Sequence, residues 1–155
     1  MTPDLSAAIR IPTYWLMIVI ALSLVGAAVV MHYEALERLN RLLPRWQLAP
    51  RLRVLFLIFG IISLHTAEIW VFGVGIFVSA QFPQLGSIAG VEPLQLLDAV
   101  YLSTTTFTSV GYGDLAPHGP LRLVLGSEAL TGLVLIAWSA SFTYLEMQRF
   151  WRNGN

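Results

Sequence analysis

The chain has 155 residues, of which 56% are hydrophobic and only 12% are charged, and its mean hydropathy is +0.69. A soluble domain carries about 25% charged residues, and half of that share cannot cover the surface of a water-soluble protein of this size. The formal net charge is zero and there is no cysteine, so the chain offers neither a polyanion-binding surface nor a disulfide or thiolate metal site. The composition therefore excludes a cytosolic enzyme, a nucleic-acid binder and a disordered segment, and it predicts a small integral membrane protein.

Three apolar stretches reach the roughly 20 residues that a membrane-spanning helix needs. We expect an N-terminal peripheral helix within residues 1–33, an outer helix over 54–80 and an inner helix over 121–148. The second stretch contains Glu68 as its only charged residue, and the third, between Arg122 and Glu146, contains only Glu128. No internal repeat accompanies them.

The placement of arginine predicts the orientation in the membrane. Five arginines lie within residues 34–53 and two in the C-terminal tail, whereas Arg10 and Arg122 would lie on the other side. Because cytoplasmic loops are enriched in arginine, we expect the 34–53 loop and the C-terminus in the cytoplasm and the N-terminus outside. A cleaved signal peptide is the alternative for the first stretch, but it would export the arginine-rich loop. The expected location is the plasma membrane, which in a bacterium is the inner membrane, with several spans.

The 34–53 linker has an amphipathic pattern of its own. Leu36, Leu39, Leu43 and Trp46 recur at helical spacing with arginines between them. This pattern predicts a short helix that lies on the inner membrane surface, with arginine side chains extending to the lipid headgroups.

The region between the second and third stretches is different. Residues 81–90 indicate an extracytoplasmic loop, and Pro93 suits the first position of a helix over 93–107. Such a helix would be about 20 Å long, which is too short to cross the membrane. A glycine-containing segment, 108–114, follows immediately. Non-helical backbone at membrane depth is tolerated only inside protein or beside a water-filled path, so this re-entrant segment predicts a permeation pathway.

The residue types in that segment suit a cation. Gly111 and Gly113 can adopt backbone angles that other residues avoid, so successive carbonyl groups can point to one side. With the Ser109 hydroxyl below them, these carbonyls can replace the water shell of a cation, while Val110 and Tyr112 point away and pack as a cuff. The preceding helix directs the negative end of its dipole towards this place, which also favours a cation.

The sequence Ser-Val-Gly-Tyr-Gly-Asp at 109–114 resembles the selectivity-filter signature of potassium channels. The similarity extends from about Leu52 to Tyr144, over the outer helix, pore helix, filter and inner helix of the two-helix pore module, and the stretch 101–108 is similar to the family's pore-helix ending. The resemblance implies potassium sites at Ser109, Val110, Gly111, Tyr112 and Gly113, with Thr108, Asp114 and Tyr101 supporting the filter. The departures are Ser109, where threonine is usual, and the first helix, which a two-helix channel lacks.

The resemblance also assigns two roles outside the filter. Tyr101 falls where the family often has an aromatic residue that hydrogen-bonds to the filter aspartate, here Asp114. Gly132 falls where the family has its inner-helix hinge, and Ile136 and Ala140 continue the same face of that helix. Close helix packing is an equal alternative for Gly132, since small residues commonly have this role in membranes.

The resemblance implies an all-α integral membrane protein with three transmembrane helices, a re-entrant pore helix and a filter loop, assembled as a four-fold tetramer in the lipid bilayer. The implied function is a passive potassium-selective channel that is not an enzyme and needs no cofactor beyond the permeant potassium ions. The alternatives are a non-conducting or modulatory channel-like subunit and a less selective cation channel. We expect no voltage sensor, and no regulatory cytoplasmic domain after the pore domain, 54–155.

Three ionisable residues lie well inside the second and third apolar stretches: His65, Glu68 and Glu128. Burying such groups costs several kcal/mol unless they are paired, so each is a candidate functional residue. They could form a metal site, a proton sensor or a hydrogen-bond network that braces the pore helix through Thr104 or Thr105. The network is the favoured interpretation, because so few ligands without cysteine make a poor metal site.

Overall fold

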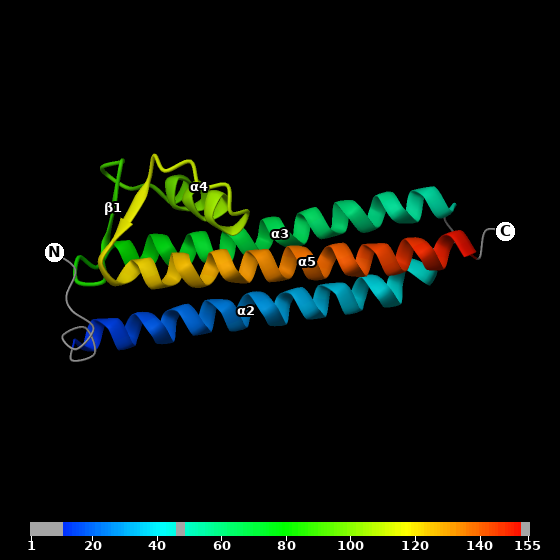
Figure 1. Ribbon diagram of the computed structural model, residues 1–155, viewed down its shortest axis with the longest axis horizontal. Helices are drawn as coiled ribbons and strands as arrows, with labels where there is room; N and C mark the ends of the chain where they lie inside the picture. Colours follow the sequence, from blue (N-terminus) through cyan, green and yellow to red (C-terminus); the bar gives the residue numbers. More distant parts are fainter. Residues whose placement is uncertain (1–10, 46–48, 153–155) are drawn as a thin grey trace.

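The computed structural model describes residues 11–45 and 49–152, and three long helices lie side by side in it with a short helix at one end (Figure 1). Each long helix has 31 residues, and all three are long and apolar enough to cross a membrane. The elements in chain order are α2 (Pro12–Leu42), the 3₁₀ turn η1 (Leu43–Arg45), α3 (Pro50–Ala80), β1 (Ser87–Ala89), α4 (Leu96–Phe107), β2 (Ala116–His118), the 3₁₀ turn η2 (Gly119–Leu121) and α5 (Arg122–Arg152). The mainly helical membrane fold with three spans and a short fourth helix is therefore confirmed.

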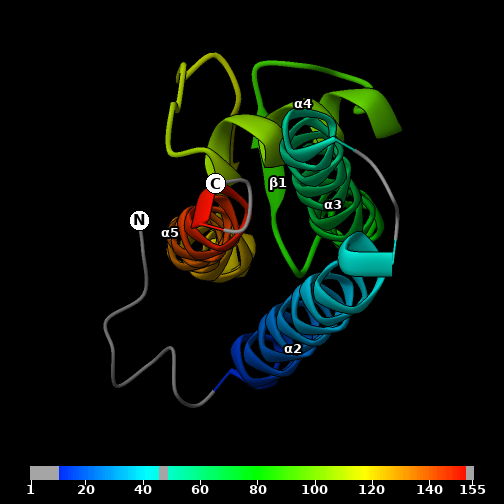
Figure 2. The same cartoon turned by 90° about the vertical axis from the view of Figure 1, so that its right-hand side faces the viewer.

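The long helices occupy the corners of a triangle when they are viewed along their length (Figure 2). Helix α2 packs on α3 and α5, and α4 packs on the same two helices from the opposite side. One apolar cluster joins all four helices: Phe72 and Ile76 from α3, Phe107 from α4, Leu135 from α5 and Met17 from α2 are fully buried in it. The first helix thus shares the core of the pore-like part of the chain.

A short antiparallel ribbon connects the two segments that flank α4. Strands β1 and β2 pair with Ile88 opposite Pro117. The backbones approach closely beside the ribbon, since a Cβ atom on Gly90, whose φ is 107°, would lie 2.1 Å from the Asp114 carbonyl oxygen. The sequence predicts only a loop over 81–90, because strands of three residues are too short to show a periodic pattern. The ribbon pairs the segment that follows residue 114 with the segment that follows α3.

The expectation that 34–53 forms a separate linker element is wrong. Helix α2 continues well past residue 33, and its Leu36, together with Leu43 of η1, packs against Leu57 of α3 in a second apolar cluster. Ion pairs four residues apart stabilise the extension: Arg38 to Glu34 at 3.8 Å and Arg41 to Glu37 at 2.6 Å. The apolar stripe that predicts a helix on the membrane surface therefore packs on protein. Trp46 lies outside the described residues, as do Arg10 and the expected outer N-terminus.

The start of the short helix also differs from the expectation. Helix α4 begins at Leu96, so Pro93 is not its first residue. The Gln95 N–H donates to the Asp98 carboxylate at 2.9 Å, and this contact caps the first turn. Helix α3 begins earlier than expected, with Pro50 in its first turn, where the missing N–H of proline leaves no helical hydrogen bond unmade.

Candidate functional site

The segment after α4 leaves the helical conformation immediately. The Thr108 N–H still donates to the Thr104 carbonyl oxygen at 3.2 Å, and the Thr108 hydroxyl donates to the same oxygen at 2.7 Å. The Gly111 N–H then turns back to the Thr105 carbonyl oxygen at 3.0 Å. These contacts hold the first half of the 108–114 segment against the C-terminal end of α4.

The backbone of this segment alternates in the sign of φ. Ser109, Gly111 and Gly113 have φ values of 59°, 56° and 82°, whereas Val110 and Tyr112 have no positive φ. Alternation between left-handed and ordinary conformations turns successive peptide groups to the same side of the chain. The carbonyl oxygens of one strand can therefore line one path, which is the arrangement that the glycine spacing predicts.

The segment is open to the outside of the single chain. Val110 is 56% exposed and Tyr112 is 72% exposed, so neither packs into the core of its own chain. The Tyr112 ring stacks in parallel on the ring of Tyr101, with centroids 6.4 Å apart and planes 6° apart. The cuff expected from Val110 and Tyr112 stays a prediction about an assembly.

Tyr101 and Asp114 meet across the filter segment. The Tyr101 hydroxyl donates to Asp114 Oδ2 at 2.9 Å, which is the contact that the family resemblance implies. This hydrogen bond to a carboxylate raises the pKa of the Tyr101 phenol. Asp114 is therefore held beside α4 at the outer end of the segment.

A buried polar contact lies behind α4. The Ser103 hydroxyl contacts Glu128 Oε1 of α5 and lies 2.8 Å from the Ile69 carbonyl oxygen of α3. Glu128 is fully buried, and its Oε2 has no hydrogen-bond partner among the described residues. The expected bracing partners are wrong, because the hydroxyls of Thr104 and Thr105 bond to carbonyl groups of α4 itself. Ser103 is the residue that links α4 to both neighbouring helices.

Gly132 provides close packing between α5 and the end of α4. A Cβ atom at Gly132 would lie 2.1 Å from the Phe107 carbonyl oxygen, so only glycine fits. Ile136 and Ala140, on the same helix face, are exposed in the single chain. The geometry accounts for glycine through packing, and the hinge stays a prediction.

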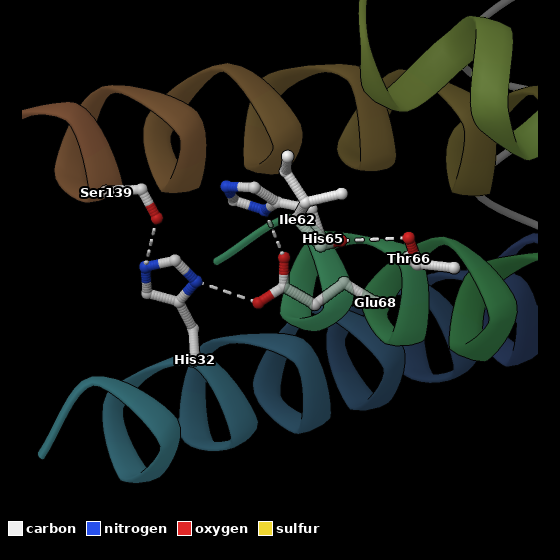
Figure 3. Close-up of polar contacts among 6 residues, drawn as sticks. All are labelled: His32, Ile62, His65, Thr66, Glu68 and Ser139. Atoms are coloured by element: carbon white, nitrogen blue, oxygen red, sulfur yellow. Dashed lines mark hydrogen bonds and ion pairs between the residues drawn. The ribbon is translucent and has the colours of Figure 1, made fainter. Parts of the chain in front are cut away.

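A second buried polar cluster joins α2 to α3 (Figure 3). His32 Nδ1 lies 2.8 Å from Glu68 Oε1, and His65 Nδ1 lies 2.7 Å from Glu68 Oε2. His32 and Glu68 are fully buried, and the hydroxyl of Ser139 from α5 lies 3.5 Å from His32 Nε2. Glu128 has no part in this cluster, so the three ionisable residues expected in one network belong to two separate sites.

The sequence interpretation missed His32 and Ser103. His32 lies at the end of a charge-free stretch, two residues before Glu34, so it resembles the polar end of a span. A usable signal was the four-residue spacing of Ala28, His32 and Leu36, which places all three on one helix face, and the structure buries all three. Ser103 has no such signal, because it is one of four consecutive hydroxyl-bearing residues.

Comparisons with known proteins identify one family model and several relatives. The family model described as "Ion channel" matches residues 51–148, which contain α3, α4, the 108–114 segment and most of α5. The protein LctB of Geobacillus stearothermophilus is 39% identical over 67 residues, which are 43% of this chain and 50% of that protein. The inward rectifier potassium channel Kirbac3.1 of Paramagnetospirillum magnetotacticum is 38% identical over 63 residues, 40% of this chain and 21% of that protein.

The protein LctB of Bacillus caldotenax is 42% identical over 59 residues, 37% of this chain and 44% of that protein. The chain thus spans half or less of the length of these relatives. No solved structure matches it. The family model concerns the part of the chain that follows α2.

Proposed function

Because this chain belongs to the ion channel family, we propose that it is a passive potassium-selective channel whose ion path is built from the backbone of residues 109–113. The alternation of φ at Ser109, Gly111 and Gly113 is the observation that carries the proposal. It supports a row of carbonyl oxygens that can replace the hydration shell of a potassium ion. The name of the relative Kirbac3.1, a potassium channel, agrees with this ion.

In the proposed mechanism, neighbouring residues have different roles. The carbonyl groups of residues 109–113 bind dehydrated potassium ions in a row, and the Ser109 hydroxyl completes the lowest site. The C-terminal end of α4 adds its partial negative charge below that site. The Tyr101–Asp114 hydrogen bond and the stacking of Tyr112 on Tyr101 fix the outer half of the strand. The residues thereby provide binding and desolvation, and no chemical step is needed.

One chain provides only part of such a path. The exposure of residues 109–113 in the single chain agrees with an assembly of four identical chains around a closed axis. Each chain would then contribute one carbonyl-lined wall, and Val110 and Tyr112 would pack between α4 of their own chain and the neighbouring chain. The Ile136 and Ala140 face of α5 would line the inner part of the path.

The charges support an orientation in the plasma membrane. Arg149 near the end of α5 donates to Asn40 Oδ1 at 3.3 Å, so the C-terminal arginine lies at the same end as the arginine-rich end of α2. The 108–114 segment lies at the opposite end (Figure 1). Since arginine concentrates on the cytoplasmic side, the filter would open to the outside. Arg152 has no described side chain.

The test is to reconstitute the purified chain alone into planar bilayers and to measure reversal potentials with mixed potassium and sodium salts, potassium-rich on one side and sodium-rich on the other. We expect the reversal potential to approach the potassium equilibrium potential. Gly113→Ala is the informative variant, because its Cβ meets no atom within 4 Å while its φ of +82° opposes any side chain. Gly26→Ala is the matched control, since it also meets no atom within 4 Å and its backbone has no positive φ.

We expect Gly113→Ala to abolish current or selectivity and Gly26→Ala to conduct like the unmodified chain. Equal permeation of sodium and potassium through the unmodified chain would instead identify a less selective cation channel. A folded, reconstituted chain that passes no ions at all would identify a non-conducting or modulatory subunit. A Gly113→Ala channel with unaltered selectivity would place the filter elsewhere in the chain.

A further inference from the structure

We propose that His32, His65 and Glu68 form a binding site for a divalent transition-metal cation of the zinc class, which joins α2 to α3 within the membrane. The site goes beyond permeation, because it lies away from the residues 109–113 and uses a ligand from α2. Each of the three residues offers one ligand atom, and these atoms all lie within 4.8 Å of one another. Two imidazoles and one carboxylate are an established protein ligand set for zinc, with a fourth position left to water.

The side chains already converge on a single point (Figure 3). The two Nδ1 atoms face the two oxygens of one carboxylate at 2.8 Å and 2.7 Å, and the two imidazole rings are 5.6 Å apart. Around a tetrahedral zinc ion with bonds of about 2.1 Å, neighbouring ligand atoms lie about 3.4 Å apart. To admit the ion, the two nitrogen–oxygen contacts would open by about 0.6–0.7 Å, and ligand atoms that lie up to 4.8 Å apart would close towards about 3.4 Å.

The surroundings of the two imidazoles fix their orientation. A metal-binding histidine usually donates its second ring N–H to a nearby oxygen, and this contact selects the tautomer. Ser139 Oγ lies 3.5 Å from His32 Nε2, the nitrogen that a metal bound at Nδ1 would leave free. The His32 ring also packs against Trp138 at 5.1 Å, and the His65 ring packs against Phe107 at 5.7 Å between ring centroids.

An ion could reach the cluster from the side. A pocket of about 440 Å³ lies between α3 and α5, and both His65 and Ser139 line it. His65 is the exposed member of the cluster, since its side chain is 17% accessible while those of His32 and Glu68 are fully buried. The site thus has an entrance as well as a ligand set.

The charge of the site also suits a cation. Glu68 supplies a carboxylate inside an apolar layer, where an unpaired charge is costly. His65 packs against Phe107, which is the last residue of α4, and the C-terminal end of a helix carries partial negative charge. Because the site contacts the end of the pore helix, an ion bound there would tie the position of α2 to the residues that support the filter.

The experiment uses the full chain, purified in detergent and freed of metal with a chelator. Zn²⁺ is added and its binding is measured by titration calorimetry, and zinc X-ray absorption is then recorded on the loaded protein. We expect one ion per chain, two imidazoles in its coordination shell and nitrogen or oxygen ligands at about 2.0–2.1 Å. Bound Zn²⁺ should also raise the thermal unfolding temperature.

The variants His32→Gln and His65→Gln should lose this binding. His118→Gln is the matched control, because the chain has three histidines and His118 is the exposed one, on β2. Ser139→Ala removes only the contact to His32 Nε2, and it should weaken binding by about 10-fold. Because Ser139 is not a proposed ligand, this variant still tests the site if a ligand variant fails to fold.

Absence of saturable binding to the unmodified chain would overturn the site and leave a hydrogen-bonded His–Glu–His network. Equal loss of binding in His118→Gln, or an absorption spectrum without two imidazoles, would place the ion elsewhere and overturn it as well. Channel activity is not used as a readout, so the outcome is independent of the proposed potassium conduction.

Discussion

At the scale of single residues, the contact between Ser103 and Glu128 depends on one proton. The serine hydroxyl has a single hydrogen, but it lies within bonding distance of both the Ile69 carbonyl oxygen and the Glu128 carboxyl group. A carbonyl oxygen can only accept. Both contacts can be full two-centre hydrogen bonds only if the Glu128 carboxyl carries a proton and donates it to Ser103, while Ser103 donates to Ile69; otherwise the two acceptors share the one serine hydrogen. The protonated arrangement places a neutral acid behind the pore helix.

The first prediction follows from this arrangement. Glu128→Gln should leave thermal stability and ion selectivity nearly unchanged, because the amide N–H can donate to Ser103 as the protonated carboxyl does. Glu128→Leu should destabilise the protein by about 1–3 kcal/mol, because it leaves the Ser103 oxygen buried without its second partner. Thermal unfolding of the two variants in detergent measures the difference. A Gln variant as unstable as the Leu variant would show that a charged carboxylate is required.

Residue patterns predict the conformation of the 109–114 segment more readily than the buried clusters. The Ser-Val-Gly-Tyr-Gly-Asp sequence is contiguous, so its glycine spacing predicts the backbone that the structure shows at Gly111 and Gly113. His32 and Glu68 are 36 residues apart in sequence and meet only because α2 packs on α3. Residues joined by tertiary packing leave no local pattern, which is why the sequence identified two of the three members of that cluster.

At the scale of elements, the junction of α4 with α5 is a close backbone contact beside the 108–114 segment. The second prediction is that Gly132→Ala lowers stability by about 1–3 kcal/mol, because its Cβ would meet the Phe107 carbonyl oxygen at 2.1 Å and the helices would have to separate. Gly126→Ala on the same helix is the control, since its Cβ would meet no atom within 4 Å. Thermal unfolding compares the two. If Gly132 is only a hinge, both variants should be equally stable and only the Gly132 variant should alter gating.

Helix α2 provides the third prediction. Deletion of residues 1–42 should leave potassium selectivity intact, because the ion channel family model begins at residue 51 and the filter contacts lie in α4. The same deletion should lower the unfolding temperature, because it removes the buried Met17 and leaves Glu68 Oε1 without His32.

Adding Glu68→Gln to the deletion should recover part of the lost stability, since glutamine has no charge to leave unpaired. Reversal potentials and unfolding temperatures of both proteins test this. A deletion protein that assembles but conducts sodium and potassium equally would show that α2 shapes the filter.

The existence of the three spans was predictable from the sequence, whereas the end of α2 and the start of α4 were not. Runs of apolar residues predict the three spans, but the end of α2 depends on packing that the sequence does not display. Leu36 and Leu43 have the same helical spacing whether they lie on lipid or on Leu57, and only the structure distinguishes the two. The start of α4 depends on a single capping contact between Gln95 and Asp98, which competes with the signal from Pro93.

At the scale of the whole molecule, the single chain leaves a large apolar surface uncovered. Lipid can cover the exposed leucines and valines of α2, but it cannot suitably cover the backbone of residues 109–113, whose carbonyl groups need polar partners. In the proposed assembly, ions and the matching segments of other chains would meet that need. The exposed Ile136 and Tyr144 of α5 continue the same open side towards the other end of the molecule.

The last prediction concerns the number of chains in the assembly. A tetramer should give a mass of four times 17.2 kDa for its protein part in light scattering that corrects for detergent. Mixing subunits tests whether the four chains share one path. If unmodified and Gly113→Ala chains are expressed in equal amounts and one altered wall abolishes conduction, about one sixteenth of the potassium current should remain, which is the fraction of tetramers with four unmodified chains. Gly26→Ala chains mixed in the same ratio should leave the current unchanged, which controls for expression and assembly. A residual current of about one half would mean that each chain conducts by itself, and it would contradict a path built by four chains.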